Sequence, residues 1–229
     1  MDLEKIYEQD PSPSRPSDEF LLSKLFESKG LSMDAVSFDR TCWFHLTRTH
    51  PANKFEQGLL PLDRYVDSIW NFLFSLLKGD ITKKEWNDFR HCIETNFPNH
   101  FAHLYRLKIN DSFHWGPHAI LVKDVAFREQ EVGAHNYFRT PEIVEDICTC
   151  FEKKYNMDLS DRFIKNTVPC IVKFCEDEAE FSYLKPALMY LYCVYREYAF
   201  SHYCNTCFDG EGKVIGEDKI LRVEFLGEK

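Results

Sequence analysis

The sequence lacks the features that would place the chain in a membrane or along a nucleic-acid backbone. Its longest apolar stretch, Ile69 to Leu77, is interrupted by Asn71 and Ser75 and is too short to cross a bilayer. Lys and Arg number 28 against 37 Asp and Glu, so the net charge is −9. Phosphate neutralisation needs a basic face, so this balance argues against broad nucleic-acid binding and leaves only a local basic groove open.

Several familiar catalytic motifs are also absent. The chain contains no Gly-rich phosphate loop, no G-x-S-x-G elbow and no H-E-x-x-H zinc motif. The first ten residues, MDLEKIYEQD, are acidic and have no apolar core, which predicts that there is no secretory signal. We therefore expect a cytoplasmic protein whose nine cysteines are reduced, many of them buried as small hydrophobic side chains.

The composition is that of a globular protein with a well-filled core. Hydrophobic residues make up 44% of the 229 positions, and aromatic residues make up an unusually high 15%. Residues 1–17 are rich in proline and serine and predict a flexible lead-in, followed by a single domain over residues 18–229. Strand and helix patterns mix without regular alternation, which predicts an α+β fold: a small mixed or antiparallel sheet, a helical hairpin at about 61–97 and several flanking helices.

Periodicity and capping signals predict where these elements lie. Helices are expected over 18–29, 61–78, 82–97, 140–155 and 184–203, with a capping box at Thr82 and Glu85 and a cap at Thr140. Strands are expected over 42–46, 118–127, 169–175 and within 214–226. The run 118–127 is almost continuously apolar, so we expect it to be a central strand.

A polar cluster follows the first predicted strand and is the strongest candidate for chemistry. It consists of His45, Thr47, Arg48, Thr49 and His50. His45 would hydrogen-bond a ligand's ribose or amide through its ring nitrogens, with Thr47 steadying it. The alternative is a histidine at a strand end that makes a structural bond to the backbone.

The order of residues from His45 to Leu59 resembles the opening of the ADP-ribosyltransferase fold. His45-Leu-Thr47 is followed by Asn53, Phe55 and Gly58-Leu59. DarT-like DNA-modifying enzymes and RNA 2′-phosphotransferases begin with such a strand, then a short helix and a Gly-Leu pair. The resemblance implies an NAD-dependent enzyme that transfers ADP-ribose to a protein or nucleic-acid acceptor. In it, His45 would hold the NAD ribose hydroxyls and Thr47 would support the site.

The same resemblance implies a stacking aromatic residue and a late glutamate on a strand. Cleavage of the glycosidic bond of NAD passes through an oxocarbenium-like ribose, which a carboxylate stabilises. Glu217 and Glu224 are the candidates by chain order, and Tyr137 is the candidate for stacking. Arg139, just before a predicted helix start, is expected to contact phosphate. The alternatives are surface carboxylates and a capped loop with a core aromatic residue.

Two other interpretations stay open. One is zinc binding by Cys204 and Cys207, which form a C-x-x-C pair after His202. A structural zinc site normally has two ligand pairs and only this pair is evident, so zinc remains the alternative and our prediction is no metal site. A non-catalytic interaction module, such as a regulatory, assembly or phage or bacterial counter-defence protein, would also suit an acidic surface with abundant aromatic residues.

Overall fold

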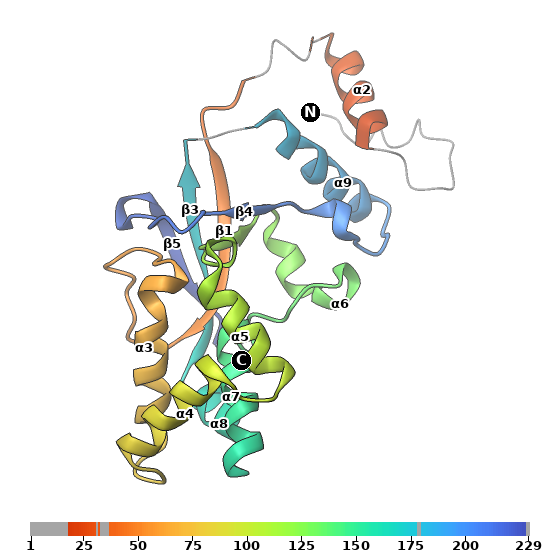
Figure 1. Ribbon diagram of the computed structural model, residues 1–229. Coiled ribbons are helices and arrows are strands. Elements are labelled where there is room, and N and C mark those ends of the chain that lie inside the picture. The colour runs from red at the N-terminus through yellow and green to blue at the C-terminus, as the bar shows by residue number, and fades with distance from the viewer. Residues whose placement is uncertain (1–17, 31, 33–36, 178–179, 228–229) are drawn as a thin grey trace. The chain divides into compact units, whose positions relative to one another are not determined.

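The computed structural model describes residues 18–30, 32, 37–177 and 180–227, and the predicted lead-in 1–17 lies outside them. The predicted α+β class is confirmed. A five-stranded antiparallel sheet has the strand order β4-β2-β1-β3-β5. Figure 1 shows its long strands β1 and β3 side by side. Its strands are β1 (Thr41–Thr49), β2 (His118–Ile120), β3 (Val168–Glu176), β4 (Cys207–Asp209) and β5 (Ile220–Phe225). None of the helices in the described part of the chain is long and apolar enough to span a membrane.

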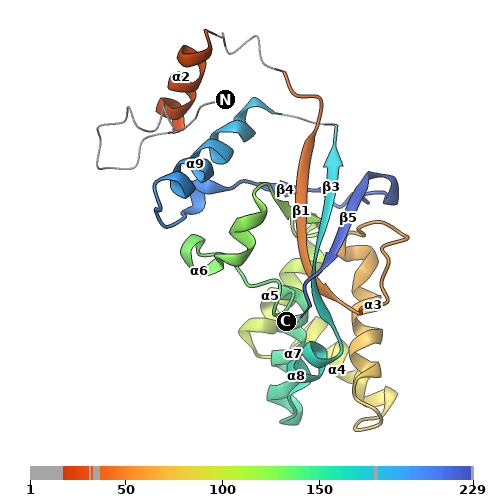
Figure 2. The ribbon, with the colours of Figure 1, turned by 180° about the vertical axis from the view of Figure 1, so that it is seen from behind.

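The described residues group into two compact units. Of these residues, the first unit takes in those up to Phe44, those of Ala119–Ala134 and those between Lys173 and Phe208, and the second takes in His45–His118, His135–Val172 and those from Asp209 onward. Figure 2 shows the strands from behind, where β1 and β3 can be followed as neighbours.

The core of the first unit forms where α2 (Asp18–Lys29) packs against α9 (Leu184–Tyr195). The unit also contains the short α6 (Glu129–Val132). Its buried side chains are mostly aliphatic and aromatic: Leu21, Leu22, Phe26, Val122, Val125, Leu188, Met189, Tyr192, Cys193, Phe200 and Cys204. Cys42 and Cys175, on β1 and β3, are joined by a disulfide, so the expectation of reduced thiols is wrong for this pair.

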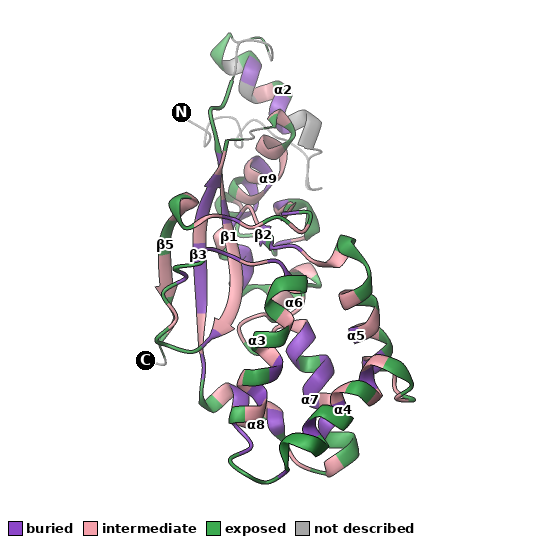
Figure 3. Ribbon diagram, turned by 60° about the vertical axis from the view of Figure 1, so that its left-hand side comes forward, coloured by how far each residue is buried: buried purple, intermediate pink, exposed green. Residues whose placement is uncertain are grey.

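The core of the second unit is helical and strongly aromatic. Its helices are α3 (Leu62–Ser75), α4 (Lys83–Thr95), α5 (His100–Asn110), α7 (Glu142–Tyr155) and α8 (Leu159–Lys165). The Trp70 and Trp86 rings pack edge to face with centroids 4.8 Å apart, and Trp70 Nε1 donates a hydrogen bond to the Tyr105 hydroxyl at 2.9 Å. Figure 3 shows the buried residues along α7 that complete this core. The predicted pair of helices over 61–97 is present as α3 and α4, and the Thr82–Glu85 capping box is confirmed.

The prediction of a strand over 118–127 is wrong beyond Ile120. The Asn205 side-chain oxygen accepts hydrogen bonds from the backbone N–H groups of Leu121 and Val122, at 3.0 and 3.1 Å. The Leu121 N–H also donates to the Thr206 carbonyl at 3.1 Å, so only the Val122 donor is given over to Asn205, and Lys123–Phe127 continues as a 3₁₀ helix. The short β2 does lie inside the sheet, between β4 and β1.

Other local features can be compared with the predictions in the same way. The last predicted helix ends at Tyr195 rather than Tyr203, since Glu197 has a left-handed φ of 55° and Tyr198 N–H turns back to the Cys193 carbonyl. Helices α5 and α8 were not predicted, although Asn99 and Asp158 cap them in the usual way. Strand β5 lies within the predicted 214–226, over the alternating residues Ile220–Phe225, and a 3₁₀ turn precedes it.

Candidate functional site

His45 projects from β1 with its ring fixed by one backbone group. Its Nδ1 lies 2.7 Å from the His118 carbonyl oxygen, and because a carbonyl only accepts, Nδ1 must carry the proton. Burial lowers the pKa of His45, which favours the neutral ring. The remaining nitrogen, Nε2, is then a hydrogen-bond acceptor, and it has no hydrogen-bond partner among the residues that the structure describes.

The position of the His118 carbonyl is set by two facing backbone segments. Gly116 has a φ of 58°, and a Cβ there would lie 2.6 Å from the His118 nitrogen, so this turn requires glycine. Gly210 N–H donates to the Pro117 carbonyl at 3.0 Å, and Gly212 N–H donates to the Gly116 carbonyl at 2.8 Å. These bonds fix the turn whose next residue binds His45.

The rest of the predicted polar cluster divides into two roles. Thr47 is half-buried and, two residues along β1, shares the strand face of His45. Arg48 points to the other face and is a structural anchor. Its guanidinium donates to the Thr167 hydroxyl at 2.8 Å and to the carbonyls of Thr167, Ile164 and Phe138 at 2.7 to 2.9 Å.

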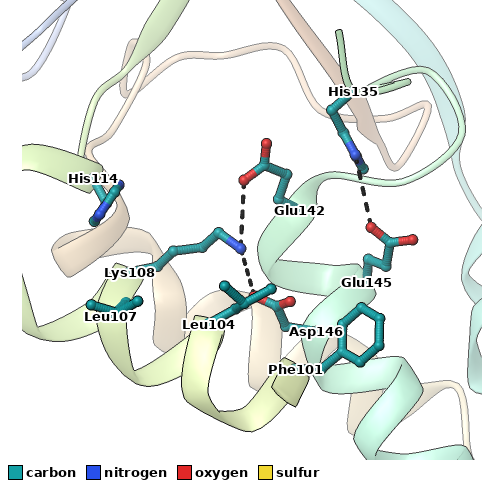
Figure 4. Close-up of a pocket in the computed structure, with 9 residues that line it drawn as sticks. All are labelled: Phe101, Leu104, Leu107, Lys108, His114, His135, Glu142, Glu145 and Asp146. Carbon is teal, nitrogen blue, oxygen red and sulfur yellow. Dashed lines mark hydrogen bonds and ion pairs between the residues drawn. The ribbon is translucent and has the colours of Figure 1, made fainter. Parts of the chain in front are cut away.

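A solvent-open pocket of about 390 Å³ lies in the second unit (Figure 4). Helix α5 supplies an apolar wall and one lysine, α7 supplies three carboxylates, and a 3₁₀ turn and a loop supply one histidine each. The lining residues are Phe101, Leu104, Leu107, Lys108, His114, His135, Glu142, Glu145 and Asp146. His45 is not among these residues.

The lysine of this pocket is held between two of the carboxylates. Lys108 Nζ lies 2.7 Å from Asp146 Oδ2 and 3.5 Å from Glu142 Oε2. Asp146 is only 2% exposed, and its burial raises the pKa of the carboxyl to about 6 although Lys108 acts in the opposite direction. Glu142 and Glu145 raise it further. The pocket therefore holds a shielded carboxylic acid that titrates close to neutral pH.

The predicted stacking residue Tyr137 lies beside the same pocket. Its hydroxyl donates to Glu142 Oε1 at 3.0 Å, and its ring packs edge-on against His135 with centroids 4.8 Å apart. His135 Nε2 donates to the Thr140 carbonyl at 2.6 Å, which leaves Nδ1 3.8 Å from Glu145 Oε2. Tyr137 is thus tied to the pocket's carboxylates, and its stacking role stays a prediction.

The predicted cap at Thr140 is wrong. Helix α7 starts at Glu142, with Pro141 at the cap position and no side-chain cap bond. Its first turn carries Glu142 and Glu145, and these carboxylates already interact favourably with the positive end of the helix. The Arg139 side chain is exposed just before this turn. The contact of Arg139 with phosphate stays a prediction.

The two candidate glutamates differ in their setting. Glu217 is exposed in the 3₁₀ turn Glu217–Lys219. Glu224 is half-buried in β5, with Oε2 4.0 Å from the Arg222 guanidinium. Only Glu224 lies in a strand, as the resemblance requires of its glutamate.

Sequence reasoning did not identify Lys108 or Asp146. Asp146 did leave a signal, because it is an acidic residue on the helix face that carries the apolar Ile143, Ile147 and Cys150. A charge at a core position is rare unless it is paired. Lys108 left none, since helix α5 itself was not predicted.

Among the described side chains, no group of three His, Cys, Asp or Glu is arranged to hold a metal ion. Cys204 is buried with its sulfur 3.6 Å from that of Cys193, while Cys207 is exposed. Comparison of the whole chain with family models, with curated proteins and with solved structures found no match.

Proposed function

We propose that this protein is an NAD-dependent ADP-ribosyltransferase-like enzyme that transfers ADP-ribose to a macromolecular acceptor. The observation that carries the proposal is the state of His45. Its Nδ1–H is committed to the His118 carbonyl, and burial favours the neutral ring. Nε2 is therefore a fixed acceptor, which is the group needed to hold a ribose hydroxyl.

The remaining roles in the proposal follow from the chemistry of the glycosidic bond. As the bond between ribose and nicotinamide breaks, nicotinamide leaves with the bonding electrons and positive charge develops on the ribose. A carboxylate next to this charge stabilises it, and Glu224 on β5 suits this role better than the exposed Glu217. Thr47 supports His45 from the same strand face, Tyr137 is the candidate to stack on nicotinamide, and Arg139 is the candidate to contact the pyrophosphate.

Release of nicotinamide from NAD tests the proposal. Purified protein is incubated with NAD, with and without protein and nucleic-acid acceptors, and nicotinamide is quantified by chromatography. The wild-type chain should release nicotinamide, and His45→Ala should reduce the rate about tenfold or more, the equivalent of one lost hydrogen bond in the transition state. His91→Ala is the matched control, because His91 is an exposed histidine on α4.

Absence of turnover in the wild-type chain, or equal rates for His45→Ala and His91→Ala in folded protein, would contradict this function. Circular dichroism and thermal unfolding of each variant show whether a lost rate reflects lost chemistry or a lost fold.

A second candidate function is a non-catalytic protein-interaction module, and the edge strand β5 favours it. β5 lies at one end of the sheet, and its Leu221 and Phe225 are 53% and 41% exposed. An edge strand with exposed apolar side chains can pair with a strand of a partner. A complex isolated from native cells that survives His45→Ala but is lost on Leu221→Lys supports this candidate.

A further inference from the structure

Two cysteines on neighbouring strands of the sheet face each other. Cys42 on β1 and Cys175 on β3 have Cα atoms 4.3 Å apart, although 133 positions separate them in the chain. Residues that face each other in a non-hydrogen-bonded antiparallel pair have Cα atoms about 4.5 Å apart. The separation is therefore the one that strand pairing produces by itself.

A second cross-strand contact supports the same register. Phe44 lies two residues further along β1, and Lys173 lies two residues back along β3. The Lys173 ammonium sits 5.9 Å from the centre of the Phe44 ring. Two successive pairs thus match one antiparallel alignment, which brings the two sulfurs together whether or not they are bonded. Making or breaking the bond requires no rearrangement of the backbone.

Access to solvent distinguishes this pair from the fully buried cysteines. Cys42 is half-buried, and Cys175 is 9% exposed. By contrast, Cys148, Cys150 and Cys170 are at most 2% exposed, and burial raises the pKa of each thiol, which suppresses the reactive thiolate. Cys42 is therefore the sulfur of the pair that an external reagent reaches more readily.

We propose that Cys42 and Cys175 form a reversible thiol–disulfide modification site whose co-reactant is a low-molecular-weight disulfide such as oxidised glutathione. The Cys42 thiolate attacks one glutathione sulfur, forms a mixed disulfide and releases one glutathione thiolate. The Cys175 thiolate then attacks the Cys42 sulfur and releases the second glutathione. The protein dithiol loses two electrons and two protons, and one oxidised glutathione becomes two reduced glutathione molecules. Reduced glutathione reverses both steps.

Differential alkylation of the full-length chain tests the site. The protein is equilibrated in buffers that range from fully reduced to fully oxidised glutathione, acid-quenched, and labelled with one alkylating reagent before reduction and another after it. Cys42 and Cys175 should change label together across this series, while the buried Cys148 and Cys150 keep the first label. The oxidised chain should also unfold about 5–10 °C above the reduced chain, because the bond closes a long loop.

Two variants separate the bond from general effects of thiol chemistry. In Cys42→Ser the difference in unfolding temperature between oxidised and reduced protein should vanish. In Cys92→Ser, which changes a half-buried cysteine on α4, the difference should persist. The alkylation of the wild-type chain needs no variant, so a folding defect in Cys42→Ser leaves the site testable.

Three results would overturn the proposal. In the first, both cysteines carry the first label at every glutathione ratio. In the second, they stay cross-linked in fully reduced glutathione, which identifies a permanent structural disulfide. In the third, the pair that changes label is Cys193 and Cys204, whose sulfurs lie 3.6 Å apart.

Discussion

Replacing Asp146 by asparagine should make the free energy of unfolding less dependent on pH. The reason is that ionising the buried Asp146 carboxyl at neutral pH destabilises the folded state. The carboxyl is 2% exposed, and its pKa rises from 3.8 to about 6 on folding. A pKa difference of about two units corresponds to about 3 kcal/mol. The Asp146→Asn variant keeps a side chain of the same shape and never ionises.

The sign of the effect follows from proton binding. Between about pH 4 and pH 6 the folded chain holds a proton on Asp146 that the unfolded chain has already released. The free energy of unfolding therefore falls as the pH rises through this window and is constant, for this group, above it. Relative to Asp146→Asn, the wild-type chain should lose about 3 kcal/mol between pH 4 and pH 7.

The attraction between Lys108 and ionised Asp146 is already part of the pKa of about 6, so the variant adds only the nearly constant difference between asparagine and the protonated carboxyl. Lys108 Nζ lies 2.7 Å from Asp146 but also 3.5 Å from Glu142, so the variant still offers it one carboxylate. Urea unfolding of both proteins at several pH values measures the slope and separates it from this offset. Asp161→Asn is the control, because Asp161 is an exposed carboxylate paired with Lys165.

A direct titration checks the same reasoning without any variant. Carboxyl carbon NMR of the wild-type chain should show Asp146 titrating near pH 6. A midpoint at or below pH 4, or equal pH slopes for wild type and Asp146→Asn, would refute the argument that desolvation outweighs the ion pair.

Two further predictions concern residues that hold the second unit together. Arg48→Ala should lower the free energy of unfolding by about 2–4 kcal/mol, since it leaves the hydroxyl and carbonyl of Thr167 and two other carbonyls without their donor. Gly58→Ala should lower it by at least about 2 kcal/mol, because a Cβ would lie against the Ile215 carbonyl oxygen and φ is 75°. Chemical denaturation measures both changes.

Each of these predictions has its own control. Arg64→Ala changes an exposed arginine on α3 and should be close to neutral, and an equal loss in the two arginine variants would contradict the anchoring role of Arg48. Gly79→Ala also places alanine at a positive φ, but no atom lies within 4 Å of its Cβ. A loss at Gly79 as large as that at Gly58 would show that φ alone, and not the contact with Ile215, sets the cost.

Elements with strong local signals could be predicted from the sequence, and elements decided by distant contacts could not. Helix α4 could be predicted from Thr82 and Glu85, because the side chain of each accepts a hydrogen bond from the backbone N–H of the other at the helix start. The run 118–127 is apolar enough for a strand, but the side chain of Asn205, more than eighty positions away, accepts hydrogen bonds from the Leu121 and Val122 N–H groups where the strand ends. Periodicity carries no information about such a competitor.

In the candidate site, too, local features could be predicted from the sequence and those that depend on distant contacts could not. His45 could be singled out as a candidate from the residue order alone, because it follows aromatic residues and precedes Thr47 on a predicted strand. Its tautomer depends on the His118 carbonyl, which is 73 positions away and is set by the turn at Gly116. The pair of Lys108 and Asp146 joins two helices, so neither local sequence contains the reason for the other.

Under the proposed function, the charge of the pocket in Figure 4 determines which part of NAD can bind there. With its carboxyls ionised, the pocket sets Glu142, Glu145 and Asp146 against the single ammonium of Lys108. This excess of negative charge repels a pyrophosphate and favours a cation. Nicotinamide is cationic while it remains bonded to ribose, whereas the pyrophosphate needs positive groups such as Arg139. The NAD proposal therefore rests on His45, and a pyrophosphate must bind outside the carboxylate pocket.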